Sequence, residues 1–187
     1  MTDLDILIIG GVAAGTSAAA KAKRVNPDVD VTLITEEVDI SYASCGIPYV
    51  ISGKIKSFEK LIARTKDQFE RSGINIQTGI RAEKIDPSGK KVKVTYLAEH
   101  KTDELKYDRL ILSTGARART LNVLGYTNIE QGIFTLRTLQ DGRRIQDYLE
   151  SCGNRAVIIG AGFAGVEMAD ALNERGFDVT LVEALDQ

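Results

Sequence analysis

The sequence predicts an α/β fold built on a doubly wound parallel sheet. Two glycine-rich turns, at residues 10–15 and 160–165, each follow a short apolar run and precede a run with helical spacing. Strand-like and helix-like runs alternate around both turns, which is typical of βαβ units. The 187 residues suffice for one large domain and part of a second. We name residues 10–15 the first glycine turn and residues 160–165 the second glycine turn.

A βαβ unit begins the chain. Residues 4–9 are an apolar run closed by Gly10-Gly11, which indicates a buried strand entering a tight turn. Residues 13–24 are rich in alanine and end in basic residues, as a helix often does. The apolar residues 30–35 complete the unit as its second strand.

The middle of the chain is expected to contain an antiparallel excursion, because residues 92–97 and 104–107 alternate between apolar and polar side chains around polar turns. The expected elements are a helix over 66–72, strands over 74–77, 92–97, 104–107 and 109–112, and a turn at Pro87-Ser88-Gly89.

The last third returns to the first pattern after an irregular stretch, residues 116–132, which we interpret as a linker. We therefore predict a Rossmann-like fold with a partial second dinucleotide-binding domain, the first domain spanning 1–118 and the second 119–187. The expected elements of the second are a helix over 138–151, a strand over 155–159, a helix over 164–175 and a strand over 178–183.

Composition narrows the possible partners. The formal net charge is -2 and no long basic block occurs, which argues against a nucleic-acid partner. No apolar run is long enough to span a bilayer, so we expect no membrane partner. The two cysteines, Cys45 and Cys152, lie far apart, and His100 is the only histidine, so we expect no metal site. A cytoplasmic chain with reduced thiols fits best.

The second glycine turn has the spacing of a dinucleotide-binding motif. Gly160 permits the tight turn, Gly162 lets a pyrophosphate approach the backbone, and Gly165 lets helix and strand pack closely. The helix N-terminus then offers N–H groups to the phosphates. Glu183, at the end of the next strand, is placed to bind a ribose, and its charge favours NAD over NADP. The alternative is a glycine-rich turn without a ligand.

The first glycine turn is less regular. In Gly10-Gly11-Val12-Ala13-Ala14-Gly15, valine stands where the middle glycine is expected. We expect Glu36, directly after the second strand, to be the ribose partner. Simple packing of strand on helix is the alternative for this turn.

Cys45 is the candidate redox centre. It lies in Ser41-Tyr42-Ala43-Ser44-Cys45-Gly46-Ile47-Pro48-Tyr49. If a helix begins over 46–50, its dipole would stabilise a Cys45 thiolate, to which Ser41 and Ser44 could donate hydrogen bonds. Since no second cysteine is nearby, a reactive Cys45 would cycle through a mixed disulfide, a persulfide or a sulfenic acid. A small buried hydrophobe is the alternative.

These segments together resemble the N-terminal part of the pyridine nucleotide-disulfide oxidoreductases. The resemblance is closest to the single-cysteine branch, which contains coenzyme A-disulfide reductases, NADH oxidases, NADH peroxidases and sulfur or polysulfide reductases. Residues 41–49 are the most specific match, and residues 107–116 resemble the segment where the chain leaves the FAD domain. The second glycine turn with Glu167 and Glu183 resembles the NAD domain.

The resemblance implies a role for each matching residue. Cys45 would be the redox thiol. Arg24, in the last turn of its helix, is equally explained as an ordinary capping cation. The residues implied to bind FAD are Gly10, Val12, Ala13, Ala14, Gly15, Glu36, Ser44, Ala82, Thr114 and Gly115; those implied to bind NAD(H) are Gly160, Gly162, Phe163, Ala164, Gly165 and Glu183; and those implied to contact substrate are Ser17, Lys21, Arg24 and Ser41.

We therefore expect an FAD-dependent NADH oxidoreductase that passes electrons through Cys45 to a thiol or disulfide-type acceptor. Residue patterns leave open whether that acceptor is a small-molecule disulfide, a polysulfide, oxygen or peroxide. The resemblance also implies a homodimer. Because members of the family continue well past Glu183, the alternative is a truncated, catalytically inactive nucleotide-binding or dimerising fragment.

Overall fold

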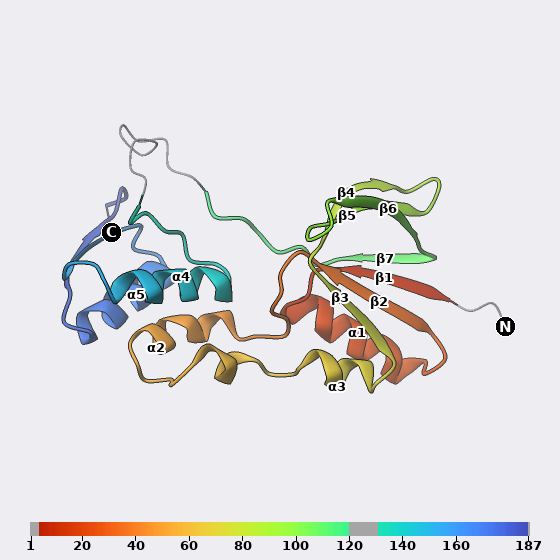
Figure 1. Cartoon of the computed structure of the whole chain (residues 1–187), viewed down its shortest axis with the longest axis horizontal. Helices are drawn as coiled ribbons and strands as arrows, with labels where there is room; N and C mark the ends of the chain where they lie inside the picture. Colours follow the sequence, from red (N-terminus) through yellow and green to blue (C-terminus); the bar gives the residue numbers. More distant parts are fainter. Residues whose placement is uncertain (1–3, 120–130, 187) are drawn as a thin grey trace. The chain divides into compact units, whose positions relative to one another are not determined.

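A computed structural model describes residues 4–119 and 131–186 (Figure 1). The chain divides into two compact units. The first unit is Met1–Tyr42 with Ile62–Ala116, and the second unit is Ala43–Leu61 with Arg117–Gln187. Residues 120–130 of the expected linker lie outside the described residues. None of the described helices is long and apolar enough to cross a membrane.

A four-stranded parallel sheet forms the centre of the first unit, in the order β3-β2-β1-β7. Ile9, the last residue of β1, is in register with Ile34 on β2 and with Leu112 on β7. The carboxyl ends of the strands therefore meet at one edge, where the first glycine turn follows β1. The strands are β1 (Asp5–Ile9), β2 (Asp30–Thr35), β3 (Ile74–Thr78) and β7 (Arg109–Leu112).

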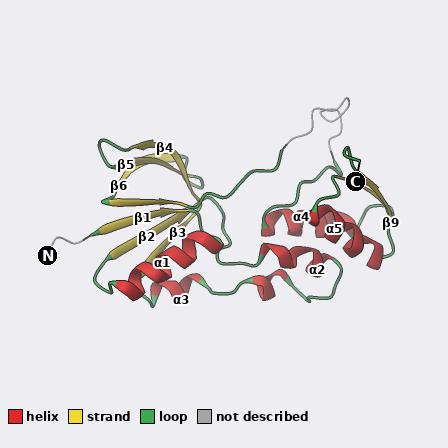
Figure 2. Ribbon diagram, turned by 180° about the vertical axis from the view of Figure 1, so that it is seen from behind, coloured by secondary structure: helices red, strands yellow, loops and turns green. Residues whose placement is uncertain are grey.

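Both faces of this sheet are covered. The helices α1 (Ala13–Val25) and α3 (Lys66–Glu70) lie on one face, and the antiparallel strands β4 to β6 lie on the other (Figures 1 and 2). Ile8 packs into the core on the helical side, whereas Leu7 and Ile9 pack on the antiparallel side. Burial on both faces explains why β1 is continuously apolar from Ile6 onward rather than alternating.

The antiparallel layer contains β4 (Ile80–Asp86), β5 (Lys91–Tyr96) and β6 (Lys101–Lys106). Sequence reasoning predicted two of these strands and missed β4. In β4 the register shifts between Ala82 and Lys84, which marks a β-bulge. The bulge puts Ile80, Ala82 and Ile85 against the same core, so the apolar residues do not follow the period of two that identifies a strand.

The second unit contains a two-stranded parallel sheet, β8 (Arg155–Ile159) and β9 (Asp178–Val182), with α5 (Phe163–Glu174) packed on it. The helices α2 (Ile47–Ile51) and α4 (Leu139–Leu149) pack against each other, and α2 also packs against α5. Two short 3-10 helices, η1 (Ser44–Gly46) and η2 (Phe58–Leu61), flank α2. The Rossmann-like α/β class predicted from the sequence is confirmed. The expected double winding is not, because helices cover one face of the sheet of the first unit and antiparallel strands cover the other.

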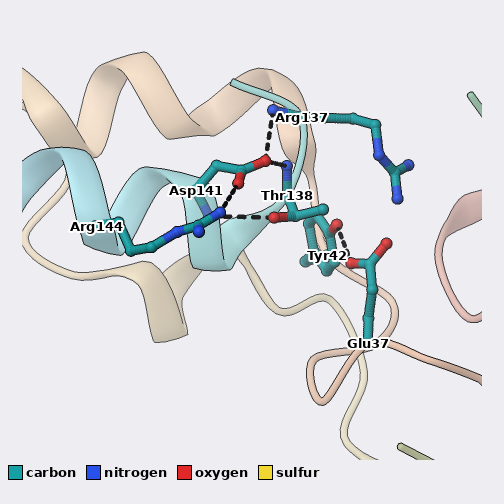
Figure 3. Close-up of polar contacts among 6 residues, drawn as sticks. All are labelled: Glu37, Tyr42, Arg137, Thr138, Asp141 and Arg144. Carbon is teal, nitrogen blue, oxygen red and sulfur yellow. Dashed lines mark hydrogen bonds and ion pairs between the residues drawn. The ribbon is translucent and has the colours of Figure 1, made fainter. Parts of the chain in front are cut away.

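The start of α4 is stabilised by a buried carboxylate (Figure 3). Asp141 accepts hydrogen bonds from the backbone N–H groups of Arg137 (3.0 Å) and Thr138 (2.9 Å), and its own N–H donates to the Thr138 hydroxyl. Arg144 also donates to the carboxylate. Burial tends to raise the pKa of Asp141, but these hydrogen bonds outweigh it and leave the pKa below its ordinary value of 3.8.

An Asp141→Ala variant should lower the free energy of unfolding by about 1–3 kcal/mol, because two N–H groups lose their partner. Since the folded pKa is depressed, this difference is complete above the unfolded pKa and disappears as the pH falls through the folded pKa. Urea unfolding at pH 7 and pH 3 measures it. Asp147→Ala, at an exposed position of the same helix, is the control. Equal losses in the two variants at pH 7 would contradict the capping role.

Candidate functional site

The first glycine turn is closed tightly against its neighbours. Gly10 has φ +118, and its N–H donates to the carbonyl oxygen of Ile34 at 2.9 Å. A Cβ placed on Gly15 would overlap the carbonyl oxygen of Gly10 and lie 2.7 Å from the Ser113 Oγ. Only glycine therefore fits at position 15. The hydroxyl of Ser113 donates to the carbonyl oxygen of Ile9 (2.9 Å), a contact that sequence reasoning did not anticipate.

The helix that follows this turn begins without a side-chain cap. Val12 occupies the N-cap of α1, no side chain bonds to the first N–H groups, and the first turn contains no acidic residue. Ala13 and Ala14 are exposed there. The first N–H groups of a helix have no partner within the helix, so this end of α1 is suited to binding an anion.

The second glycine turn repeats the same construction. Gly160 has φ +103, and a Cβ on Gly165 would overlap the Gly160 carbonyl oxygen. Gly162 is the N-cap of α5, which also has no side-chain cap and no acidic residue in its first turn. Among the described residues, a Cβ on Gly162 would meet nothing within 4 Å, so these residues leave the space beside this backbone open. Phe163 is 93% exposed at the start of the helix, and Ala164 beside it is exposed as well.

Other described helices show that missing caps are not general in this chain. Thr65 closes a capping box with Gln68 at the start of α3. Thr138 does the same with Asp141 at the start of α4. The two helices that follow the glycine turns thus differ from α3 and α4 in leaving their N-terminal N–H groups without side-chain partners.

The two acids predicted to bind ribose lie directly after the second strand of each βαβ unit. Glu36 follows β2 and is exposed, whereas the neighbouring Glu37 accepts a hydrogen bond from the Tyr42 hydroxyl at 2.6 Å (Figure 3). Glu183 follows β9 and accepts a 2.7 Å hydrogen bond from the Ala161 N–H of the second glycine turn. That bond, with others from the backbone of residues 184 and 185, holds the pKa of Glu183 below its ordinary value.

Ser41 is hydrogen-bonded to the first glycine turn. Its backbone is in the left-handed region (φ +51), which is uncommon for a residue other than glycine. Its N–H donates to the Gly11 carbonyl oxygen, and its carbonyl oxygen accepts from the Ala63 N–H, both at 2.8 Å. These two bonds hold the unusual conformation in place.

Cys45 lies in η1, immediately before α2, and is exposed. Gly46 is the N-cap of α2, so the helix expected after the cysteine is present. An exposed thiol does not fit the alternative of a small buried hydrophobe. Ser44 beside it is exposed as well.

The remaining predicted residues belong to the first unit. Ser17, Lys21 and Arg24 are exposed on α1, and their spacing of four and three places them on one face of the helix. Thr114 and Gly115 follow β7, with Gly115 at φ +66. Ala82 is half-buried on β4 and packs against the core.

The predicted site residues divide between the two units. The first unit contains the first glycine turn, Glu36, Ser41 and the exposed face of α1, and the second unit contains Cys45, the second glycine turn and Glu183.

A Gly162→Ala variant should bind NADH more weakly while its fold stays almost as stable as that of the wild type. Because a Cβ there meets no atom of the described residues within 4 Å, the free energy of unfolding in urea should change by less than about 1 kcal/mol. The sequence predicts that the pyrophosphate of NAD(H) approaches the backbone here. On that prediction the methyl group would occupy the pyrophosphate's space, and the KM or Kd for NADH should rise about tenfold or more. Gly153→Ala, which also meets no atom within 4 Å, is the matched control. Unchanged NADH affinity in Gly162→Ala would contradict the role of this turn.

Two βαβ units with glycine turns of the same construction define a nucleotide-binding protein of the Rossmann type. Residues 4–187 match the sequence profile of the pyridine nucleotide-disulphide oxidoreductases, so the chain belongs to this family. It is 38% identical over 183 residues to the NADH oxidase of Methanocaldococcus jannaschii, with 97% of this chain and 40% of the relative covered. It is 32% identical over 179 residues to the coenzyme A disulfide reductase of Staphylococcus haemolyticus, with 95% of this chain and 40% of the relative covered.

Solved structures agree with the assignment. The reduced CoADR-RHD of Bacillus anthracis superposes with a TM-score of 0.96 at 34% identity, covering 100% of this chain and 34% of that one. An NAD-dependent persulfide reductase from A. fulgidus superposes with a TM-score of 0.92 at 34% identity, covering 98% of this chain and 34% of that one. The chain thus spans about two fifths of the curated relatives it matches.

Proposed function

We propose that this chain carries the dinucleotide sites and the redox thiol of an FAD-dependent NADH oxidoreductase. The first glycine turn, with Glu36, would hold the FAD. The second glycine turn, with Glu183, would hold NADH. The observation that supports this most is the shared construction of the two glycine turns. Each joins a parallel strand to a helix of more than two turns whose N-cap makes no side-chain hydrogen bond, which leaves the first N–H groups available to an anion. Of the other described helices, α3 and α4 are capped and only the five-residue α2 is not.

Held by the first glycine turn and Glu36, FAD would supply the two-electron chemistry that links NADH to the acceptor. The chain's contribution is to bind both groups and to present Cys45. Glu183 carries a negative charge where a 2′-phosphate would lie, which favours NADH over NADPH.

Cys45 would carry the disulfide chemistry. Its thiolate attacks one sulfur of a disulfide acceptor, which forms a mixed disulfide with Cys45 and releases one thiolate. Two electrons and a proton then cleave the mixed disulfide, so that the second thiol leaves and the Cys45 thiolate is restored. The exposure of Cys45 supports this role, since the attacking sulfur must reach a dissolved substrate.

A small-molecule disulfide or persulfide is the acceptor class that we favour. The relatives named above are a coenzyme A disulfide reductase, a persulfide reductase and an NADH oxidase. Ser17, Lys21 and Arg24 add two positive charges to an exposed face of α1, which suits a disulfide bearing phosphate groups. A homodimer in the cytoplasm remains our expectation.

An absorbance spectrum of the purified protein tests the proposal. The expected result is a flavin band that bleaches under anaerobic conditions when NADH is added and bleaches far less with NADPH. A protein that stays colourless after incubation with FAD would overturn the proposal and would favour a nucleotide-binding role without catalysis.

A further inference from the structure

Cys45 and the second glycine turn belong to the same compact unit. Residues 43–61, which include Cys45 and α2, are grouped with the C-terminal part of the chain rather than with the first glycine turn. Within this unit α2 packs against α5, the helix that begins at the second glycine turn. The apolar residues Ile47 and Ile51 of α2 are each only 1% exposed.

Two polar contacts join the end of α2 to the end of α5. The Lys54 Nζ lies 2.5 Å from the Glu174 carboxylate and 3.9 Å from that of Asp170. The Arg175 guanidinium donates a 3.2 Å hydrogen bond to the carbonyl oxygen of Ile51, the last residue of α2. The hydrogen bond to Glu174 raises the pKa of Lys54, so the lysine stays charged across the working pH range.

These two contacts are directional, whereas the apolar packing between the helices is not. Burial of apolar surface is non-directional and tolerates small shifts or rotations of a five-residue helix. The hydrogen bond from Arg175 to one particular carbonyl oxygen, in contrast, is directional and is lost when α2 shifts along α5. The Lys54 ion pair adds a second attachment between the same helix ends. Both contacts lie at the C-terminal ends of the helices, whereas Cys45 precedes α2 and the second glycine turn precedes most of α5.

We propose that Lys54 and Arg175 are positioning residues. They fix α2 on α5 and thereby hold Cys45 at a fixed position relative to the second glycine turn. The proposal rests on the proposed function, because this position affects the reaction only if Cys45 and the nicotinamide site serve the same electron transfer. Displacements of about 1 Å in a reacting group can lower rates by about 100-fold, so a loss of this position should appear in kcat.

The test compares the Lys54→Ala/Arg175→Ala double variant with the wild-type protein. We expect kcat for NADH-dependent disulfide reduction to fall ~10-fold or more, while the KM for NADH stays within about twofold. Lys54→Arg should retain the wild-type kcat, and in the Lys54→Glu/Glu174→Lys pair the second substitution should restore most of the loss caused by the first. Lys66→Ala, which removes an exposed ion pair with Glu70 on α3, is the control.

Hydrogen exchange gives a second measurement that needs no turnover. In the double variant, the amides at the end of α2, which donate from Ser52 to Pro48 and from Gly53 to Val50, should exchange several-fold faster, while those of α4 do not change. Provided that the wild-type protein is active, the positioning role would be overturned if the double variant kept the wild-type kcat. It would also be overturned if Glu174→Lys failed to restore the activity lost in Lys54→Glu, or if these amides exchanged at the wild-type rate. A wild-type protein that does not oxidise NADH would overturn the proposed function instead. The hydrogen-exchange result would still decide whether Lys54 and Arg175 hold α2 on α5.

Discussion

A Gly15→Ala variant is expected to lose FAD binding and about 3 kcal/mol of its free energy of unfolding. The added Cβ would overlap the carbonyl oxygen of Gly10 and lie 2.7 Å from the Ser113 Oγ. Gly10 cannot move aside easily, because its N–H is bonded to Ile34 and its φ of +118 is already a conformation that favours glycine. The clash must therefore push α1 away from β1.

Urea unfolding and a flavin-binding titration measure this result. Gly153→Ala is the control, because a Cβ at that position meets nothing within 4 Å. Gly165→Ala should reproduce the loss of stability in the second unit, since its Cβ would overlap the Gly160 carbonyl oxygen in the same way. A Gly15→Ala protein that unfolds like the control and keeps its flavin would show that the close packing of this turn is not required.

A Cys45→Ser variant is expected to lose disulfide reduction by about 1,000-fold or more, because a serine hydroxyl cannot form the mixed disulfide. Flavin binding, NADH-dependent bleaching and urea unfolding should stay close to wild type, because the Cys45 side chain is exposed. Steady-state thiol release from a disulfide substrate, measured beside the flavin spectrum, checks both expectations.

Cys152→Ser is the matched control, since Cys152 is the other free thiol and is half-buried on the loop after α4. It should retain wild-type turnover. If Cys45→Ser still reduces the disulfide at the wild-type rate, or if Cys152→Ser loses activity equally, the assignment of Cys45 as the redox thiol is wrong.

Much of the fold follows from residue patterns that are local in sequence. The strands β2 and β8 have the predicted bounds, because each is an apolar run closed by a turn or a glycine. The strand β4 was missed because the bulge between Ala82 and Lys84 breaks its alternation and its interior reads as charged. Alternation of apolar and polar residues identifies a strand only where the strand has no bulge and its hydrogen-bond ladder is regular.

In the candidate site, too, the features that could be predicted are local in sequence, and those that could not depend on distant residues. The glycine turns and Cys45 could be predicted, because their glycine spacing and segment composition are local features. The left-handed backbone of Ser41 and the hydroxyl contact of Ser113 could not, because each depends on a residue far along the chain, Ala63 and Ile9 respectively. The contact between Lys54 and Glu174 joins residues even further apart, and no sequence pattern indicates it.

The anaerobic absorbance spectrum of the flavin-loaded protein, recorded first with NADH and then with a disulfide, tests the central claim most directly. The account predicts that NADH bleaches the flavin band in both wild type and Cys45→Ser, and that the disulfide restores the band quickly in wild type only. Restoration at the same rate in both proteins would contradict the claim that the electrons leave through Cys45, and a band that NADH does not bleach would contradict the proposed function as a whole.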